Sequence, residues 1–157
     1  MNEIVRISDV VEEVLRLNTL NQEDRHIQIV REFSEVPELS LDRHKLMQIL
    51  VNLVQNARQA CAGSTQAHAQ IWVRIGMASA KFVYVEVRDN GVGIAPENLN
   101  RIFSHGFTTR KDGHGFGLHS AALAAKEMAG TLTVSSPGLG HGAVFVLQIP
   151  VGPATPP

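Results

Sequence analysis

The chain has 157 residues, enough for one domain with a full hydrophobic core. Its 14 basic and 15 acidic side chains leave a net charge of -1, which excludes an overall electrostatic attraction to nucleic acid or to an anionic membrane. The one cysteine, Cys61, excludes an internal disulfide, and no apolar run approaches the roughly 18 residues of a membrane span. We therefore expect a cytoplasmic domain, with any membrane anchor of the full-length protein placed elsewhere.

The first half of the chain predicts two helices with a strand between them. Apolar residues at helical spacing follow Ser8–Asp9, residues that can cap a helix. Residues 26–33 alternate in the manner of a strand. A longer amphipathic helix follows Ser40–Asp42 and runs to about Cys61, whose place in the apolar pattern predicts a buried thiol.

Two strongly alternating segments, 71–77 and 83–87, come next. The short link 78–80 predicts that they form an antiparallel pair of strands. Residues 89–117 are rich in glycine and turn-forming residues, with one short helix expected near 97–103. Because a loop of this length is uncommon in a compact domain unless it has a function, we expect the functional site here.

The last part of the chain predicts a helix over 117–128, stopped by Gly130, and two strands. These strands cover residues 131–135 and 143–149. The order of elements predicts an α+β fold, a two-layer sandwich in which helices cover one face of a mixed, mostly antiparallel sheet. We expect one domain over residues 1–150 and a disordered tail over 151–157.

Two asparagines, Asn52 and Asn56, lie on the longer predicted helix. Their i, i+4 spacing places both amides on one face of that helix. A side-chain carbonyl oxygen is a hard ligand suited to Mg²⁺, and a neutral ligand does not repel a polyphosphate. The pair is therefore a candidate metal site, although a solvated helix face would also accommodate it.

A second motif, Asp89 followed by Gly91 and Gly93, comes directly after a predicted strand. A buried carboxylate at this point can accept a hydrogen bond from the exocyclic amine of adenine, whereas guanine would leave it unpaired. The glycines allow close approach of the backbone to a ligand. An ordinary Asp-Asn-Gly turn is the alternative interpretation.

The third motif is the polar segment between Phe103 and Lys111, which contains Thr108, Thr109 and Arg110. Residues 101–117 carry three basic side chains and one acidic one in a nearly neutral chain. A cationic, mobile lid over a triphosphate is one interpretation, and a solvated loop is the other.

The fourth motif, Gly113, Gly115, Gly117 and Leu118, opens the predicted helix at 117. Free backbone N–H groups and the helix dipole favour phosphate at such an end. The segment is not a P-loop, because no Gly-Lys-Ser/Thr follows. It is not a dinucleotide fingerprint either, because no strand precedes it.

Taken in this order, the four motifs resemble those of the gyrase, heat-shock-chaperone, histidine-kinase and mismatch-repair ATPase superfamily, and within it the histidine kinase catalytic domain. The resemblance covers nearly the whole chain and implies a Bergerat-type ATP-binding fold. The matching segments are LMQILVNLVQNARQA, VRDNGVGI, IFSHGFTTRK, GHGFGLH and the closing GHGAVFVLQIP.

The resemblance also implies roles for individual residues and two ligands, ATP and Mg²⁺. Asn56 would hold Mg²⁺, and Asp89 would bind adenine. The candidate catalytic residues are Asn52, Asn56, Arg110 and Lys111. The candidate ATP-binding residues are Asn56, Asp89, Gly91, Gly93, Thr108, Thr109, Gly113, Gly115, Gly117 and Leu118.

The residue at position 52 favours a kinase over an ATP-hydrolysing clamp. Hydrolysing branches of the superfamily carry a glutamate there as general base for water, and Asn52 cannot accept a proton. We expect transfer of the γ-phosphate to a histidine on a separate dimerisation domain, with a response regulator downstream and no nucleic acid partner. The isolated domain is expected to be monomeric. The alternative is a non-catalytic nucleotide-sensing or interaction module of the same fold.

Other residues receive structural interpretations. Gln59 stands where several family members have a basic residue, and Arg58 lies about 100° away around the helix. His119, in the first turn of the phosphate-facing helix, is expected to be structural or solvated. Trp72 and Tyr84 are expected to pack on strands.

Overall fold

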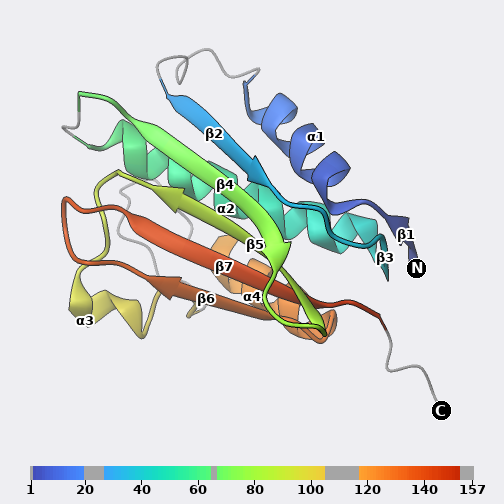
Figure 1. The fold of residues 1–157 in the computed structure, drawn as a ribbon. Helices are drawn as coiled ribbons and strands as arrows, with labels where there is room; N and C mark the ends of the chain where they lie inside the picture. The colour runs from blue at the N-terminus through green and yellow to red at the C-terminus, as the bar shows by residue number, and fades with distance from the viewer. Residues whose placement is uncertain (1, 20–26, 65–66, 105–116, 153–157) are drawn as a thin grey trace.

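The computed structural model describes residues 2–19, 27–64, 67–104 and 117–152. Figure 1 shows how its helices and strands follow one another. The elements, in chain order, are β1 (Glu3–Val5), α1 (Ile7–Thr19), β2 (Gln28–Phe33), β3 (Leu39–Leu41), α2 (Arg43–Ala62), β4 (Gln70–Met77), β5 (Phe82–Asp89), α3 (Pro96–Leu99), α4 (Gly117–Glu127), β6 (Thr131–Ser135) and β7 (Ala143–Pro150).

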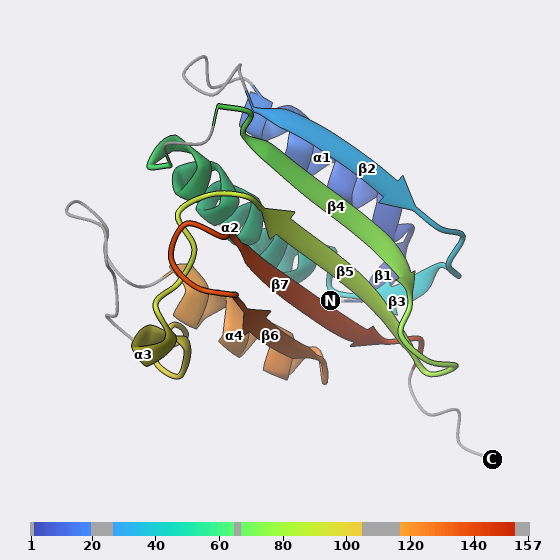
Figure 2. The ribbon, with the colours of Figure 1, turned by 60° about the vertical axis from the view of Figure 1, so that its left-hand side comes forward.

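A five-stranded sheet in the order β2-β4-β5-β7-β6 forms one layer of the molecule. Strands β2 and β4 are parallel, whereas the other three neighbouring pairs are antiparallel. Helices α1, α2 and α4 lie together on one face of this sheet (Figure 2). The predicted α+β sandwich with a mixed, mostly antiparallel sheet is thereby confirmed.

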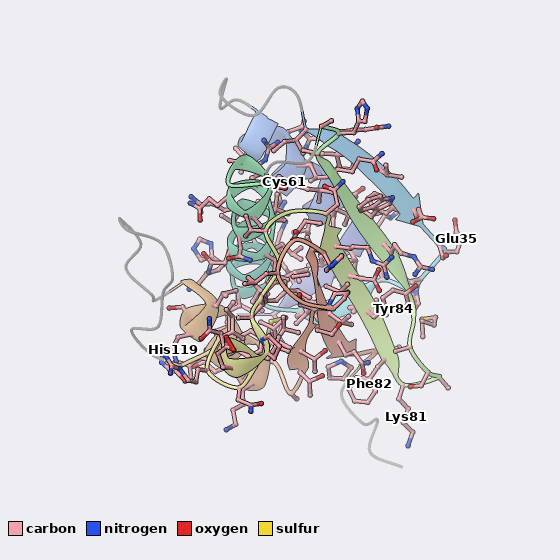
Figure 3. All side chains as sticks on the ribbon, turned by 90° about the vertical axis from the view of Figure 1, so that its left-hand side faces the viewer. Glu35, Cys61, Lys81, Phe82, Tyr84 and His119 are labelled. Carbon is pink, nitrogen blue, oxygen red and sulfur yellow. The ribbon has the colours of Figure 1, made fainter. Side chains whose placement is uncertain are left out.

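Strict alternation along the central strands builds the core. In β5, Val83, Val85 and Val87 are buried against the helices, while Phe82 and Tyr84 lie on the other face. Figure 3 shows these two aromatic side chains on the side of the sheet away from α2. The Tyr84 ring lies against its cross-strand partner Gly76, so that a Cβ there would be 2.8 Å from it. This residue therefore packs on a strand, as predicted.

Helix α2 runs across the sheet and carries the largest share of the buried helical side chains. Asp42 caps it by accepting a hydrogen bond from the Lys45 backbone N–H at 3.2 Å. The helix ends at Gly63, and Cys61 is buried, as predicted from its place in the apolar pattern. Among the residues described, no helix combines the length and the apolar character that a membrane crossing requires.

A second, two-stranded sheet of β1 and β3 was absent from the sequence predictions. Each strand has three residues, too few to show a period-two pattern, and each finds its partner about 36 residues away in the chain. The start of α1 also differs, because the helix begins at Ile7 and includes Ser8–Asp9 in its first turn. The short helix expected near 97–103 is limited to α3, after which the chain continues in turns.

The end of α4 corrects a further expectation. Ala129, rather than Gly130, takes the left-handed conformation that stops the helix, with φ of 61°. Gly130 is required for another reason, because a Cβ there would lie 2.3 Å from the carbonyl oxygen of Gln148. After β7, the Val151 N–H still donates to the Lys81 carbonyl at 2.8 Å, so hydrogen bonding continues one residue beyond the predicted domain limit at 150.

Candidate functional site

One strip of α2 connects the two halves of the candidate site. Asn52, Asn56 and Ala60 follow one another at i, i+4 spacing, so they line one side of the helix. At one end of the strip, a Cβ on Gly117 would lie 3.4 Å from Asn52 Oδ1, which places the start of α4 beside this amide. At the other end, the Ala60 carbonyl accepts a hydrogen bond from the Val92 N–H at 3.1 Å. Asn56 therefore lies between the start of α4 and the loop after β5.

Helix α4 packs along α2 in the opposite direction. Its buried side is made of alanines, Ala121, Ala124 and Ala125, which allow the two helix axes to approach closely. Lys45, near the start of α2, pairs with Glu127 at the end of α4 at 3.4 Å. This arrangement places the N-terminal end of α4, where the first N–H groups have no acceptor within the helix, beside Asn52.

Asp89 ends β5 on the helix-facing side of the sheet, with only 3% of its surface exposed. Its Oδ1 accepts a hydrogen bond from the Gly91 N–H at 2.8 Å. Its Oδ2 is buried and has no hydrogen-bond partner within the described parts of the chain. Such a buried acceptor fits a ligand that brings an N–H donor, as the amine of adenine does.

Burial also changes the acidity of this carboxyl group. Desolvation raises the pKa of Asp89 from 3.8 to about 6, against the opposing effect of the N–H groups of Gly91 and Ala143. At neutral pH the group is still mainly charged, and it remains an acceptor. A buried carboxylate with a raised pKa at the end of a strand is typical of a functional site.

The glycines after Asp89 are required by backbone packing. A Cβ on Gly91 would lie 2.4 Å from both the carbonyl carbon and the oxygen of Ala60. Gly93 has φ of 74°, and a Cβ there would lie 2.2 Å from the Gly138 carbonyl oxygen. Both predicted glycines thus keep this loop pressed against its neighbours, which leaves the Asp89 carboxylate in a fixed position.

The β6–β7 loop contributes a residue that sequence reasoning missed. Gly142 has φ of 74°, and a Cβ there would lie 1.9 Å from the Asp89 carbonyl oxygen. Its N–H donates to the Gly91 carbonyl at 3.1 Å, and its own carbonyl accepts from Ser136 Oγ at 2.6 Å. The density of glycines in 138–142 was the signal that could have indicated a close backbone approach.

Asn90 is a second residue that was missed. Its Oδ1 accepts from the Gln70 N–H at 2.9 Å, and its Nδ2 donates to the His68 carbonyl at 2.8 Å. The Cys61 thiol lies 4.0 Å from the same Oδ1. The side chain thus ties the loop after β5 to the segment that enters β4. Its place between Asp89 and Gly91 concealed this role, because any turn favours asparagine.

The structure shows the environments of Arg58 and Gln59, which follow the two asparagines on α2. Arg58 is 5% exposed and belongs to the buried face of α2, whereas Gln59 is exposed. Arg58 therefore does not substitute for a cation at position 59.

On the phosphate side, the structure places Gly117 and Leu118 at the start of α4, with Leu118 packed against the core. The other predicted residues of this side lie outside the described residues. They are Thr108, Thr109, Arg110, Lys111, Gly113 and Gly115.

Comparison with known proteins supplies the family. Residues 41–153 match the model of the Histidine kinase-, DNA gyrase B-, and HSP90-like ATPase family. The chain belongs to this family. The sensor histidine kinase ZraS of Salmonella typhi is 32% identical over 148 residues, which are 94% of this chain and 31% of ZraS. This ATPase-family chain thus spans about a third of the length of that relative.

Solved structures of the family agree with the fold described above. The catalytic domain of histidine kinase ThkA matches with a TM-score of 0.83 at 27% identity, over 98% of this chain and 99% of that one. Full-length ShkA in complex with AMPPNP matches with a TM-score of 0.80 at 26% identity, over 94% of this chain and 30% of ShkA. The assignment to the catalytic ATP-binding domain of histidine kinases, predicted from the four motifs, is thereby confirmed.

Proposed function

We propose that this domain binds Mg-ATP and transfers the γ-phosphate to a histidine on a separate dimerisation domain of a two-component sensor kinase. The observation that carries the proposal is the Asp89 Oδ2 atom, which is buried and has no hydrogen-bond partner among the described residues. It lies at the strand end whose following loop contacts Ala60, on the strip of α2 that carries Asn56. Family membership supports ATP binding, and the full-length ShkA structure contains the ATP analogue AMPPNP.

The adenine end of ATP would be recognised by Asp89. Its Oδ2 would accept a hydrogen bond from the exocyclic amine, while Gly91 and Gly93 keep the neighbouring backbone close. Guanine presents a carbonyl oxygen at the same position, and two acceptors would then face each other in a buried site. We therefore expect ATP to bind more tightly than GTP.

The phosphate end would lie at the start of α4, with Asn56 between base and phosphates. Free N–H groups near Gly117 and Leu118 favour phosphate oxygens, and the Asn56 side-chain oxygen is a suitable ligand for Mg²⁺. When bound, Mg²⁺ neutralises charge that develops on the transferred phosphoryl group. Arg110 or Lys111 would supply a further positive charge at the γ-phosphate.

The chemical step needs a nucleophile from outside the chain. Asn52 stands where hydrolysing relatives have a glutamate, and an amide cannot take a proton from water. A neutral imidazole can attack without a base, because its nitrogen lone pair is already available. The bond from phosphorus to nitrogen forms as the bond from phosphorus to the ADP oxygen breaks, and the imidazole then releases its N–H proton to solvent. A response regulator would receive the phosphoryl group afterwards.

The test uses labelled ATP with and without a purified histidine-bearing dimerisation domain from the same gene. We expect ATP binding but no labelling of this chain alone, and acid-labile, alkali-stable labelling of the added domain. Asn56→Ala should abolish the transfer, whereas Gln55→Ala, at an exposed position of the same helix, should not change it. ATP binding without any transfer would favour the non-catalytic sensing module, and strong labelling of this chain alone would contradict the proposal.

A further inference from the structure

His119 lies in the first turn of α4, where its half-buried ring contacts another segment of the chain. Its Nδ1 is 3.1 Å from the Phe103 carbonyl oxygen. Because a carbonyl oxygen only accepts, this distance requires the proton on Nδ1. Figure 3 shows His119 on the helix side of the molecule, far from the strand face that carries Phe82 and Tyr84.

The acceptor of this hydrogen bond belongs to a residue that is itself held by the core. The Phe103 ring packs edge-on against Phe145 of β7, with ring centroids 6.2 Å apart and an interplanar angle of 74°. Phe145 lies two residues beyond Ala143, the cross-strand partner of Asp89. The ring contact therefore holds Phe103 against the central part of the sheet, where Phe145 pairs with Val87.

Helix α4 has further contacts with α2 and with the core. Its alanine face packs on α2, and Gly117 lies beside the Asn52 amide. Leu118, next to His119, packs against the core. The hydrogen bond from His119 adds a polar contact between this helix end and the segment that contains Phe103.

We propose that His119 is a positioning residue, which aligns the N-terminal N–H groups of α4 with the phosphates of ATP by its hydrogen bond to Phe103. This inference rests on the proposed function, since it assumes that phosphates bind at this helix end. It assigns His119 no contact with the nucleotide. The consequence is that the side chain influences the phosphate part of the ligand and leaves recognition of the base unchanged.

Two amide substitutions separate this role from a direct contact. The Nδ2 of asparagine reaches the place of histidine Nδ1, whereas the Nε2 of glutamine reaches the place of histidine Nε2. We expect His119→Asn to retain ATP affinity. His119→Ala and His119→Gln should weaken it by about fivefold, the loss that follows from one net hydrogen bond.

The measurement is isothermal titration of each purified variant with Mg-ATP and with adenosine, together with its melting temperature. Adenosine has no phosphates, so we expect its affinity to stay the same in all variants. Equal losses for ATP and adenosine would show a general structural role and overturn the inference. Retention by glutamine but not by asparagine would indicate a direct contact through Nε2 and would also overturn it. Failure of the wild-type chain to bind ATP would instead contradict the proposed function.

Discussion

Replacing Asp89 by asparagine should make the domain more stable while it weakens ATP binding. The pKa of this carboxyl group is raised from 3.8 to about 6 because burial disfavours its charged form. The folded state therefore holds a proton that the unfolded state has already lost between these two pH values. It follows that stability falls as the pH rises from about 4 to about 6, and that the full cost, about 3 kcal/mol, is present above pH 6.

Asparagine removes that charge but recovers only part of the cost. It still offers an oxygen to the Gly91 N–H, yet it brings an amide donor to the place where Oδ2 has no described partner. We expect a gain of about 1–2 kcal/mol at pH 7.5 without nucleotide, which corresponds to a rise in melting temperature of about 3–6 °C for a chain of this size. At pH 5 the gain should shrink, because wild-type Asp89 is then mostly protonated.

Thermal unfolding of both proteins at pH 5 and pH 7.5, without nucleotide, measures this effect. Asp42→Asn is the matched control, since the pKa of Asp42 is lowered by the Lys45 N–H and asparagine also caps helices well. That variant should show no stabilisation at pH 7.5. A lower melting temperature for Asp89→Asn at pH 7.5 would refute the burial argument.

The same pair of proteins tests the ligand role. Loss of a charge-assisted hydrogen bond should weaken ATP binding by about tenfold or more at pH 7.5. If only the charged carboxylate binds adenine, wild-type affinity should fall by about tenfold between pH 7.5 and pH 5 relative to Asp89→Asn. Taking the ratio cancels the titration of the ATP phosphates. A ratio independent of pH would mean that adenine does not contact this group.

Two further pairs of substitutions test the backbone packing around Asp89. Gly142→Ala should destabilise the fold by about 3 kcal/mol or more, because its Cβ would lie 1.9 Å from the Asp89 carbonyl oxygen. Gly140→Ala should cost only about 1–2 kcal/mol, because its φ is 83° but no atom lies within 4 Å of the added Cβ. Urea unfolding of the two variants measures this difference in stability. Asn90→Ala should lower stability by about 1–3 kcal/mol because it removes two hydrogen bonds to backbone groups, whereas Asn90→Asp keeps the acceptor and should lose less. Equal unfolding midpoints within either pair would contradict these assignments.

Local patterns were sufficient to predict the long elements and the motif residues on them. The helical period of apolar residues in α2 and the period-two alternation in β4 and β5 are repeated over enough residues to be recognised in the sequence. The end of the second strand then identifies the position of Asp89. The two short strands β1 and β3 could not be predicted in this way, since three residues carry no period.

The missed parts of the site share a different physical origin. Gly142 and Asn90 act through backbone groups that are close in space but distant or inconspicuous in sequence. The contact from His119 to Phe103 joins two segments on opposite sides of residues 105–116. No periodicity encodes such contacts, because each depends on how complete elements pack.

The close backbone contacts of Gly91, Gly93 and Gly142 have a consequence for redesign of the nucleotide preference. At each of these positions a single added carbon would collide with a carbonyl group, so none of the three can be exchanged for a residue with a side chain without a backbone shift. An engineer who wants the domain to accept guanine would have to change the carboxylate itself. Asp89→Asn supplies the needed amide donor, and none of these three glycines could take a compensating side chain without a shift of the backbone.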